Sequence, residues 1–593
     1  YRLADGGLVM LRFRETPETL VLGSFLRKLP NAPFSVQPLA GRVEGARQLF
    51  RQGLGFSGPS GLVDLEAATA PRAFDSYLVT ALRPAEGKSL AIAARDHGTF
   101  LQKTTLSSRP SRRGLTSREV ESNPWVLEAG FETEGVLVHD ELALPNLHVF
   151  QAASTWQACR DAALDVARAM KARPAPLPRQ YWCSWYDKGP AFGLADLREL
   201  LDGLDGLSPR PPLQAIQIDS GYCSSPGDWL TPGPRWTEGG LQAAFDSIRS
   251  RGYAAGIWIA PFMVGSRSRL YHEHPEWVVR DLSGRPLPEW RHYGPEDGLL
   301  DPEHYALDAS HPQVVEHLRG VFRTLKQWGA TCFKTDFLDW GLKDTARVQR
   351  HDASKTSVEA FRGVMQVIRE EIGEDAYWLC CIAPYGPCLG FADAMRVAND
   401  TSVAWGVGSQ GNLLEETVAS QYMNGVLWRN DPDCVVLRDA RTAMDAAEME
   451  ALALWSGILG GPVTTSDALD RLPPRRLALW RFLEPGDGGT ASFPFWETPT
   501  KLRVAVRRYA APLGWSVLAI NPREEPVTER LEVLALVGEP AAFVWDWGPG
   551  RAEPLGSRRD LVVEAGRHAA RLFYLSAADA PPPPDLTLGG RRQ

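Results

Sequence analysis

The sequence predicts a multidomain protein in which a central (β/α)8 TIM barrel follows one antiparallel β-domain and precedes another. At 593 residues the chain exceeds one ordinary hydrophobic core, so two or three domains are expected. Across residues 181–485, short apolar strands alternate with amphipathic helices, which is typical of a parallel barrel built from repeated β-α units. The segments before and after this region alternate apolar and polar residues with a period of two, which indicates antiparallel strands.

Residues 1–165 are predicted to form the N-terminal β-domain. Segments such as 8–14 (LVMLRFR) and 89–94 (SLAIAA) read as short strands, and Gly, Pro and Asn separate them. Long helical periodicity is absent before residue 155. Residues 166–180, which include the proline-rich run 173–178 (RPAPLP), are predicted to be a linker.

Several elements of the barrel can be placed from their apolar patterns. Strands are expected at 181–186, 214–219, 254–260, 331–336, 377–381 and 394–398. One helix is expected at 311–328, with Ser310 as its N-cap, and a second at 357–372 begins with a capping box formed by Thr356 and Glu359. A doubly wound open sheet is the competing fold, but no glycine-rich nucleotide-binding motif accompanies the strands.

Alternation returns in the last part of the chain. Residues 502–506, 515–520 and 571–575 read as strands of a small C-terminal β-domain, which is expected at 486–580. Residues 581–593 begin with four prolines and are predicted to be a frayed, proline-rich tail.

The composition excludes several classes of protein. The 72 acidic and 64 basic residues give a formal charge of −8, which argues against nucleic acid or an anionic membrane surface as the main partner. No stretch approaches about 18 consecutive apolar residues, and no secretion signal is visible. The 8 cysteines are scattered without a disulfide framework, so they are expected to be reduced, mostly buried thiols in a cytoplasmic protein.

Polar and aromatic residues stand at the C-terminal ends of the predicted strands, where barrel enzymes build their active sites. In chain order these ends carry Trp185, Asp219, Trp258, Lys334 with Asp336, Cys381, and Arg396 with Asp400. Cleavage of a glycosidic bond requires two carboxylates, since one attacks the anomeric carbon and the other protonates the departing oxygen. The two strand ends that pair a carboxylate with a cation therefore predict a glycoside hydrolase.

Residues 180–435 resemble the α-galactosidases of glycoside hydrolase family 36, which retain the anomeric configuration. The resemblance rests on the ordered segments 182–186 (WCSWY), 216–219 (IQID), 227–230 (GDWL), 256–262 (GIWIAPF), 273–279 (EHPEWVV), 305–308 (YALD), 333–337 (FKTDF), 395–396 (MR) with 400–401 (DT), and 430–434 (NDPDC). The architecture that it implies is an N-terminal β-supersandwich, the barrel and a C-terminal β-sandwich. The family needs no metal or other cofactor, and none is expected here.

The resemblance implies a role for each candidate residue. Asp336 would be the nucleophile and Asp400 the general acid/base. Lys334, two residues earlier on the same strand face, would supply the positive field that keeps Asp336 ionised, whereas the surroundings of Asp400 should be drier and less cationic. By family likeness, Arg396 would help to hold the sugar or the nucleophile.

The remaining candidates would bind the sugar. Asp219 would accept hydrogen bonds from its hydroxyl groups, because charge-assisted bonds are the strong ones. Trp185 and Trp258 would shape the apolar walls of the pocket, and Cys381 aligns with a family cysteine near the C2 hydroxyl, although an inert buried thiol is an equal alternative for it.

The chain departs from the family at two positions. Where family members usually have Asp-Asp, this chain has Asp219 followed by Ser220, and the missing carboxylate would cost about 1.5–3 kcal/mol of binding to the O4 and O6 hydroxyls that define galactose. The second departure is Ile382, where closer relatives tend to have glycine, so the space around C2 is expected to differ. Neither change touches the catalytic pair.

The predicted function is a retaining exo-α-glycosidase that removes terminal α-galactosyl residues from oligosaccharides or glycosides through a covalent glycosyl–Asp336 intermediate. Alternatives within the same chemistry are a changed sugar specificity and a transglycosylase. The alternative from another class is an inactive sugar-binding protein, against which the intact Lys334, Asp336, Arg396 and Asp400 argue. A homo-oligomer is left open.

Overall fold

The described residues of the computed structural model are 8–16, 19–28, 32–67, 72–108, 125–136, 141–174, 180–291, 301–344, 346–406, 410–486, 489–498, 500–510, 512–547, 553–554, 559–577 and 581–591. They divide into two compact units. The first comprises residues 1–173, 223–234 and 258–392, and the second comprises 174–222, 235–257 and 393–593. Within the described residues, no helix has the length and apolar character needed to cross a membrane.

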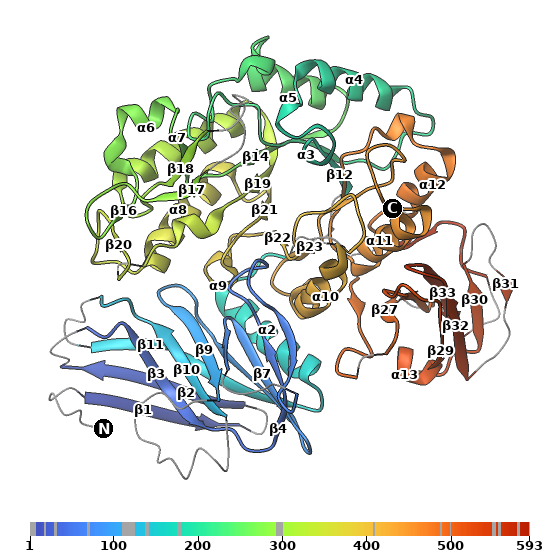
Figure 1. Ribbon diagram of the computed structural model, residues 1–593, viewed down its shortest axis with the longest axis horizontal. Helices are drawn as coiled ribbons and strands as arrows, with labels where there is room; N and C mark the ends of the chain where they lie inside the picture. Colours follow the sequence, from blue (N-terminus) through green and yellow to red (C-terminus); the bar gives the residue numbers. More distant parts are fainter. Residues whose placement is uncertain are drawn as a thin grey trace. The chain divides into compact units, whose positions relative to one another are not determined.

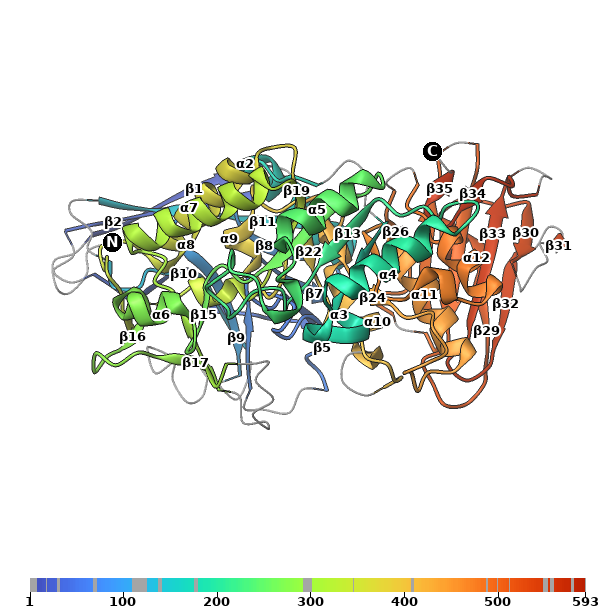
Figure 2. The ribbon, with the colours of Figure 1, turned by 90° about the horizontal axis from the view of Figure 1, so that it is seen from above.

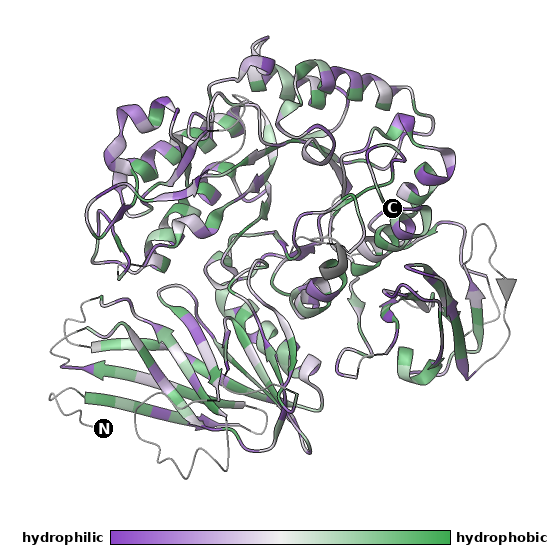
Figure 3. Cartoon of the chain, in the orientation of Figure 1, coloured by the Kyte–Doolittle hydropathy of each residue, from purple (hydrophilic) through white to green (hydrophobic). Residues whose placement is uncertain are grey.

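The N-terminal β-domain consists of two antiparallel sheets in the first unit (Figure 1). The larger sheet has the order β1 (Leu8–Glu15), β2 (Thr19–Arg27), β11 (Glu141–Ala152), β8 (Ser89–Ala94), β7 (Val79–Pro84), β4 (Ala46–Arg51) and β5 (Gly61–Asp64). The smaller has the order β3 (Ser35–Arg42), β10 (Val126–Glu132), β9 (Leu101–Ser107) and β6 (Ala73–Ser76). Hydrophobic and hydrophilic residues interchange along these strands (Figure 3), and their buried side chains form one core that includes residues of both sheets, as the sandwich prediction requires.

A helix follows this domain. Helix α2 (Thr155–Met170) begins at Ser154, whose side chain accepts a hydrogen bond from the Gln157 N–H, and packs against β7, β8 and β11. The first five residues of the predicted linker are therefore helical. Residues 175–179, which hold most of the proline-rich run, lie outside the described residues.

The parallel strands of the barrel occupy the predicted positions with small shifts of their ends. They are β12 (Gln180–Cys183), β13 (Ala215–Ile218), β14 (Ala254–Ile259), β19 (Ala330–Thr335), β21 (Tyr377–Cys380) and β22 (Ala394–Arg396), followed by the short β23 (Arg429–Asp431), β24 (Cys434–Val435) and β25 (Val463–Thr465). The sheet order is β23-β22-β21-β19-β14-β13-β12-β25-β24. Strands that follow one another in the chain are thus neighbours up to β23. The pairs β12–β13, β12–β25, β13–β14, β19–β21, β22–β23 and β24–β25 are parallel, as in a singly wound barrel.

Helices follow most of these strands. They are α3 (Trp185–Lys188), α4 (Leu194–Asp205), α5 (Gly240–Ser250), α6 (Arg269–Glu273), α7 (Pro312–Gln327), α8 (Ser357–Ile372), α9 (Tyr385–Cys388), α10 (Gln410–Ser420), α11 (Ala446–Leu459) and α12 (Pro474–Phe482). Helices α7 and α8 pack side by side (Figure 2). Short 3-10 turns and small sheets of β15 (Met263–Gly265), β16 (Arg280–Asp281), β17 (Pro288–Arg291), β18 (Glu303–Ala306) and β20 (Val348–Gln349) complete the connections.

The capping predictions had mixed outcomes. The capping box of Thr356 and Glu359 at the start of α8 is confirmed. The prediction of Ser310 as the N-cap of α7 was wrong, because His311 occupies that position and its Nδ1 accepts the Gln313 N–H. Ser310 instead donates its hydroxyl to Asp308.

The C-terminal β-domain lies in the second unit. Its larger sheet has the order β26 (Ala491–Ser492), β27 (Arg503–Arg508), β28 (Trp515–Ile520), β33 (Ala570–Ser576), β30 (Phe543–Asp546) and β31 (Glu553–Pro554). Strands β29 (Val527–Glu532) and β32 (Asp560–Ala565) form a second sheet, helix α13 (Val533–Val537) lies between them in the chain, and both sheets contribute to one core.

The end of the chain differs from its prediction as a frayed tail. Strands β34 (Leu586–Thr587) and β35 (Gly590–Arg591) form a hairpin, and the intervening Leu588 is fully buried. The Leu588 N–H donates to Phe482 O, and the Arg507 guanidinium donates to Gly589 O at 2.6 Å. One buried leucine, one backbone hydrogen bond and one hydrogen bond from an arginine side chain therefore anchor a segment whose proline run suggested only disorder.

In the first unit, the N-terminal β-domain contacts the segment that follows β21. The Tyr385 N–H donates to Leu54 O at 2.8 Å. A Cβ atom built on Gly55 would lie 2.4 Å from the carbonyl oxygen of Ala383, closer than any real Cβ contact. The backbone of Gly55 thus packs directly against Ala383, at a distance that leaves no room for a larger residue. Ala383 lies only two residues beyond Cys381.

We therefore expect the substitution Gly55→Ala to lower the free energy of unfolding by about 1–3 kcal/mol, because the methyl group must displace a backbone carbonyl. The matched control is Gly41→Ala, since a Cβ at Gly41 meets no atom within 4 Å. That variant should be neutral or stabilised by less than about 1 kcal/mol. Thermal unfolding of both variants checks the expectation. It is contradicted if Gly55→Ala has the same melting temperature as the wild type.

Candidate active site

Asp336 lies directly after β19 in the first unit and is 8% exposed. Its Oδ2 accepts the indole N–H of Trp258 at 3.0 Å, and its Oδ1 accepts the backbone N–H of Phe337 at 2.8 Å. Its own N–H donates to Ile259 O at 2.9 Å. Phe337 adopts a positive φ of 50°, which side-chain-bearing residues rarely do, and this turn aims its N–H at the carboxylate. Both oxygens of the predicted nucleophile are therefore oriented.

Lys334 and Trp258 accompany Asp336 in the same unit. Lys334 lies in β19, is 7% exposed, and projects to the same face as Asp336 because strand side chains repeat every two residues. Trp258 was predicted as an apolar wall. Its ring packs edge-on to Trp229 at a centroid distance of 6.0 Å, and its N–H adds a polar contact to the carboxylate that the sequence reading did not include.

Cys381 follows β21 and is 2% exposed, and its N–H donates to Thr335 O at 2.7 Å. The next residue, Ile382, has a φ of 40°, a region in which a β-branched side chain is strained. Its carbonyl oxygen accepts the Asp339 N–H at 2.9 Å. The second departure from the family pattern therefore coincides with a strained backbone, which glycine adopts without cost.

Asp219 and Ser220 follow β13 in the second unit. Asp219 is 3% exposed, and its Oδ2 accepts the Gln217 amide at 2.8 Å and lies 3.4 Å from the thiol of Cys183. Its Oδ1 accepts the Ser220 N–H at 2.9 Å, and its own N–H donates to Ser184 Oγ at 2.8 Å. Asp219 is thus a buried carboxylate in a fixed orientation, as a hydroxyl-binding residue requires, and Ser220 is half-buried beside it.

Asp400 lies four residues after β22 in the second unit and differs from its expected surroundings. Its side chain is 71% exposed, and its Oδ1 lies 2.9 Å from Nη2 of Arg396. The same Arg396 nitrogen lies 2.6 Å from Oδ2 of Asp433, which is 5% exposed. Within its own unit Asp400 is therefore neither dry nor remote from cations, because the exposed loop after β22 places it beside the buried guanidinium.

Two further residues that the sequence reading did not single out belong to this cluster. Asp433 also accepts the Thr401 N–H at 2.7 Å, so it ties the Asp400 loop to the β23–β24 connection. Tyr186 in α3 donates its hydroxyl to Asp400 Oδ1 at 3.2 Å. Both lie inside segments that carry the family resemblance, and their position within those segments was the only signal. Trp185, the candidate at this strand end, is half-buried at the start of α3.

Asp339 is a further buried carboxyl in the first unit, three residues after Asp336. Its Oδ1 is buried with no hydrogen-bond partner among the described residues. Burial raises the pKa of Asp339 to about 6, and Lys343 opposes this while the negative charges of Asp336 and Glu289 add to it. Lys343 is itself paired with Glu289 at 2.7 Å, so it compensates Asp339 only in part.

All 8 cysteines are thiols in this structure, seven of them buried and Cys223 half-buried, as predicted. Among the described residues, no group of three or more His, Cys, Asp or Glu side chains is arranged to hold a metal ion.

Residues 219–352 match the family model described as Melibiase. A curated relative, the A type blood α-D-galactosamine galactosaminidase of Flavonifractor plautii, is 28% identical over 199 residues, which are 32% of this chain and 18% of that protein. An α-galactosidase of Escherichia coli is 22% identical over 157 residues, 26% of this chain and 20% of that protein. The chain thus matches about a fifth of the length of these relatives. The predicted resemblance to α-galactosidases and other glycoside hydrolases is confirmed.

Solved structures extend the similarity over most of the chain. An α-galactosidase from Thermus thermophilus in complex with p-nitrophenyl α-D-galactopyranoside is 24% identical with a TM-score of 0.61, covering 86% of this chain and 95% of that one. The family 36 α-galactosidase AgaA from Geobacillus stearothermophilus, in complex with stachyose, is 13% identical with a TM-score of 0.65, covering 96% and 82%. At these identities the likeness shows the fold, and it confirms the predicted barrel with flanking β-domains.

We expect the substitution Asp339→Asn to raise stability at alkaline pH and not at acidic pH. Because the folded-state pKa is raised, the native protein binds more protons than the unfolded chain between about pH 4 and pH 6, so stability falls as the pH rises through this window. Above pH 6 the ionised carboxyl costs about 1–3 kcal/mol, which the neutral amide avoids. Asp246→Asn on the exposed face of α5 is the control. Melting temperatures of the variants and the wild type from pH 4 to pH 8 check this expectation. It is contradicted if Asp339→Asn raises the melting temperature equally at pH 4 and at pH 8.

Proposed function

We propose that this chain, whose sequence and fold resemble those of the family 36 α-galactosidases, is a retaining exo-acting α-glycosidase that hydrolyses terminal α-galactosyl residues. The proposal rests chiefly on one observation. An oriented carboxylate, Asp336, follows one barrel strand, and a second carboxylate, Asp400, follows another, as the double displacement of a retaining glycosidase requires. The substrate of the Thermus thermophilus relative, a galactoside, supports the choice of sugar.

In the first step, Asp336 attacks the anomeric carbon while Asp400 gives its proton to the departing glycosidic oxygen. The N–H groups of Trp258 and Phe337 hold the attacking carboxylate in line, so little reorientation is needed during the reaction. In the second step, Asp400 removes a proton from water, and this water releases the sugar from Asp336 with its original anomeric configuration.

The substrate-binding residues divide between the hydroxyl groups and the apolar faces of the sugar. Asp219 accepts hydroxyl hydrogen bonds through a carboxylate that Gln217 and Ser220 already orient. Trp185 and Trp258 provide aromatic walls, and Cys381 lines the region of the C2 hydroxyl. Lys334 supplies positive charge on the face of β19 that carries Asp336.

The composition of the chain supports a proposal for its cellular location and its partners. We propose a cytoplasmic location, which the seven buried thiols support, and a glycoside as the main partner in place of nucleic acid, which the formal charge of −8 supports. A homo-oligomeric state is compatible with this activity and is tested by light scattering.

The catalytic roles predict distinct products when azide replaces the missing group. Asp336→Gly should lower turnover of p-nitrophenyl α-galactoside by at least about 10⁴-fold, because the nucleophile is gone. Azide should then restore activity and give a β-galactosyl azide, since it attacks from the face that Asp336 vacates. In Asp400→Ala, azide should intercept the glycosyl-enzyme and give the α-galactosyl azide. NMR of the products checks both, and unchanged activity of either variant contradicts its role.

The position of Ser220 predicts an incomplete galactose site. On a panel of aryl α-galactoside, α-glucoside, α-N-acetylgalactosaminide and β-L-arabinopyranoside, Ser220→Asp should raise kcat/KM for the galactoside relative to the wild type. The expected factor is about 10–100, because a charge-assisted hydrogen bond is worth about 1.5–3 kcal/mol. The control Ser224→Asp adds the same charge at an exposed serine nearby in the sequence. An equal effect of both variants contradicts the assignment, and a wild-type preference for another sugar revises the substrate.

A further inference from the structure

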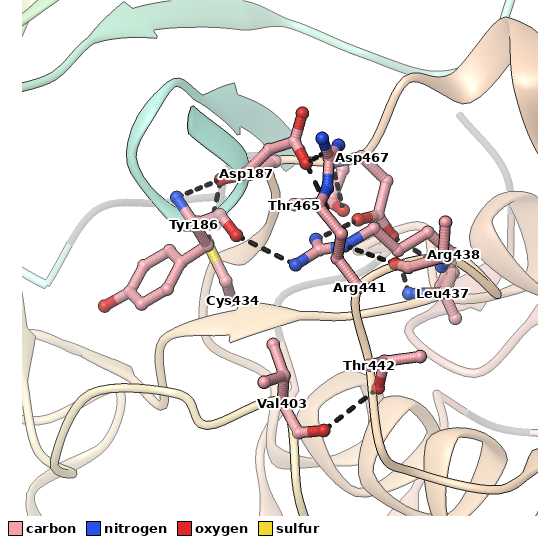
Figure 4. Close-up of polar contacts among 12 residues, drawn as sticks. Tyr186, Asp187, Val403, Cys434, Leu437, Arg438, Arg441, Thr442, Thr465 and Asp467 are labelled. Carbon is pink, nitrogen blue, oxygen red and sulfur yellow. Dashed lines mark hydrogen bonds and ion pairs between the residues drawn. The ribbon is translucent and has the colours of Figure 1, made fainter. Parts of the chain in front are cut away.

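Tyr186 is fixed by its backbone at the C-terminal end of β12. Its N–H donates to Ser466 Oγ at 3.0 Å. Its carbonyl oxygen accepts Nη2 of Arg438 at 2.9 Å (Figure 4). Ser466 follows β25 directly, so two barrel strands determine the position of this one residue.

Arg438 is in turn anchored by a fully buried carboxylate. Asp467 is 0% exposed, and its Oδ1 lies 2.7 Å from Nη1 of Arg438. Its Oδ2 accepts the backbone N–H groups of Leu437 and Arg438 (Figure 4). Burial raises the pKa of Asp467, while these donors and the guanidinium favour its charged form. A buried ion pair with this many hydrogen bonds is rigid, so the carbonyl of Tyr186 is held against a fixed cation.

The hydroxyl of Tyr186 reaches the predicted acid/base. It donates to Oδ1 of Asp400 at 3.2 Å, and Arg396 donates to the same oxygen at 2.9 Å. Arg396 also contacts the Tyr186 oxygen at 3.5 Å and pairs with the buried Asp433 at 2.6 Å. Arg396 from β22, with Asp433 behind it, and Tyr186 from α3 are thus among the charged and titratable groups of this unit that face the Asp400 carboxyl.

The two donors differ in what they can do when Asp400 changes charge. A guanidinium has only donors, so its attraction to the carboxyl weakens when Asp400 takes up the proton that the first catalytic step consumes. The phenol of Tyr186 is neutral, and its O–H can donate to Oδ1 whether the carboxyl is ionised or carries its proton on Oδ2. Retaining catalysis needs Asp400 in both forms, and of these two donors Tyr186 is the one whose contact depends less on the charge of Asp400.

We propose that Tyr186 is the positioning residue of the acid/base, holding the Asp400 carboxyl by its Oδ1 so that Oδ2 transfers the proton. The assignment of Oδ2 follows because Oδ1 is engaged by a cation and a phenol, which makes it the poorer proton acceptor. In the first step the Oδ2–H bond breaks as the proton passes to the glycosidic oxygen, and in the second Oδ2 takes a proton from water. This inference rests on the proposed function of Asp400.

The test is the dependence of kcat/KM on the leaving group, because this parameter reports the steps up to cleavage of the glycosidic bond. The variant Tyr186→Phe removes only the hydroxyl. With methyl α-galactoside, whose leaving group needs protonation, kcat/KM should fall by about 10–100-fold. With 2,4-dinitrophenyl α-galactoside, which leaves without protonation, kcat/KM should stay within about 2-fold of the wild type.

The ratio of the two values, taken on one preparation, cancels the concentration of folded enzyme, so a partly misfolded sample does not disturb it. The matched control Tyr253→Phe removes a buried hydroxyl that has no hydrogen-bond partner among the described residues and should leave the ratio unchanged. If Tyr186→Phe is not soluble, Ser466→Ala frees the Tyr186 N–H and should produce the same selective loss, smaller in size.

An unchanged ratio in Tyr186→Phe, or an equal loss on both substrates, overturns the positioning role. The variant Asp400→Ala, assayed in parallel, separates this outcome from a failure of the proposed function. If Asp400→Ala shows the leaving-group dependence and Tyr186→Phe does not, only the role of Tyr186 is wrong. If Asp400→Ala lacks this dependence, Asp400 is not the acid/base and the proposed mechanism fails with it.

Discussion

The ion pair between Arg396 and Asp433 fixes the loop that carries the predicted acid/base. The Arg396 guanidinium is 1% exposed, and a buried cation is stable only when a partner compensates its charge. Asp433, itself 5% exposed, supplies that charge and also accepts the Thr401 N–H. Because the pair joins β22 to the connection after β23, the loop between residues 397 and 401 has little freedom, and the position of Asp400 follows from this constraint.

The two predicted catalytic carboxylates are held by different chemistry, and the difference matches their proposed roles. Asp336 accepts two neutral N–H donors, which orient it without changing during the reaction. Asp400 contacts a cation and a phenol, and it is largely exposed. A nucleophile must stay in one orientation and one charge state until it attacks, whereas an acid/base must change its charge twice in each cycle. In the proposed mechanism, the exposed position of Asp400 would also give water access for the second step.

The sequence predicted those features of the fold that depend on local pattern. All six strands expected in the barrel exist, with ends shifted by at most three residues. The capping box at α8 is present because Thr356 and Glu359 need only each other and the nearby backbone. The features that it missed depend on distant partners. Nothing near Asp433 indicates a salt bridge to Arg396, and nothing in the proline run at the C-terminus indicates that Leu588 will be buried under α12.

The same distinction applies to the candidate site and shows where strain is stored. Among the described residues with a side chain and a positive φ, Phe337 follows Asp336, Ile382 follows Cys381, and Asp433 pairs with Arg396. Such conformations cost about 1–3 kcal/mol each and persist only where the surrounding contacts determine them. At Phe337 the strained turn aims an N–H at Asp336, and at Ile382 it presents a carbonyl to Asp339. Strain at these positions is therefore the physical cost of orienting the groups beside the predicted nucleophile, cysteine and acid/base, and only at Ile382, where relatives tend to have glycine, did a sequence pattern indicate it.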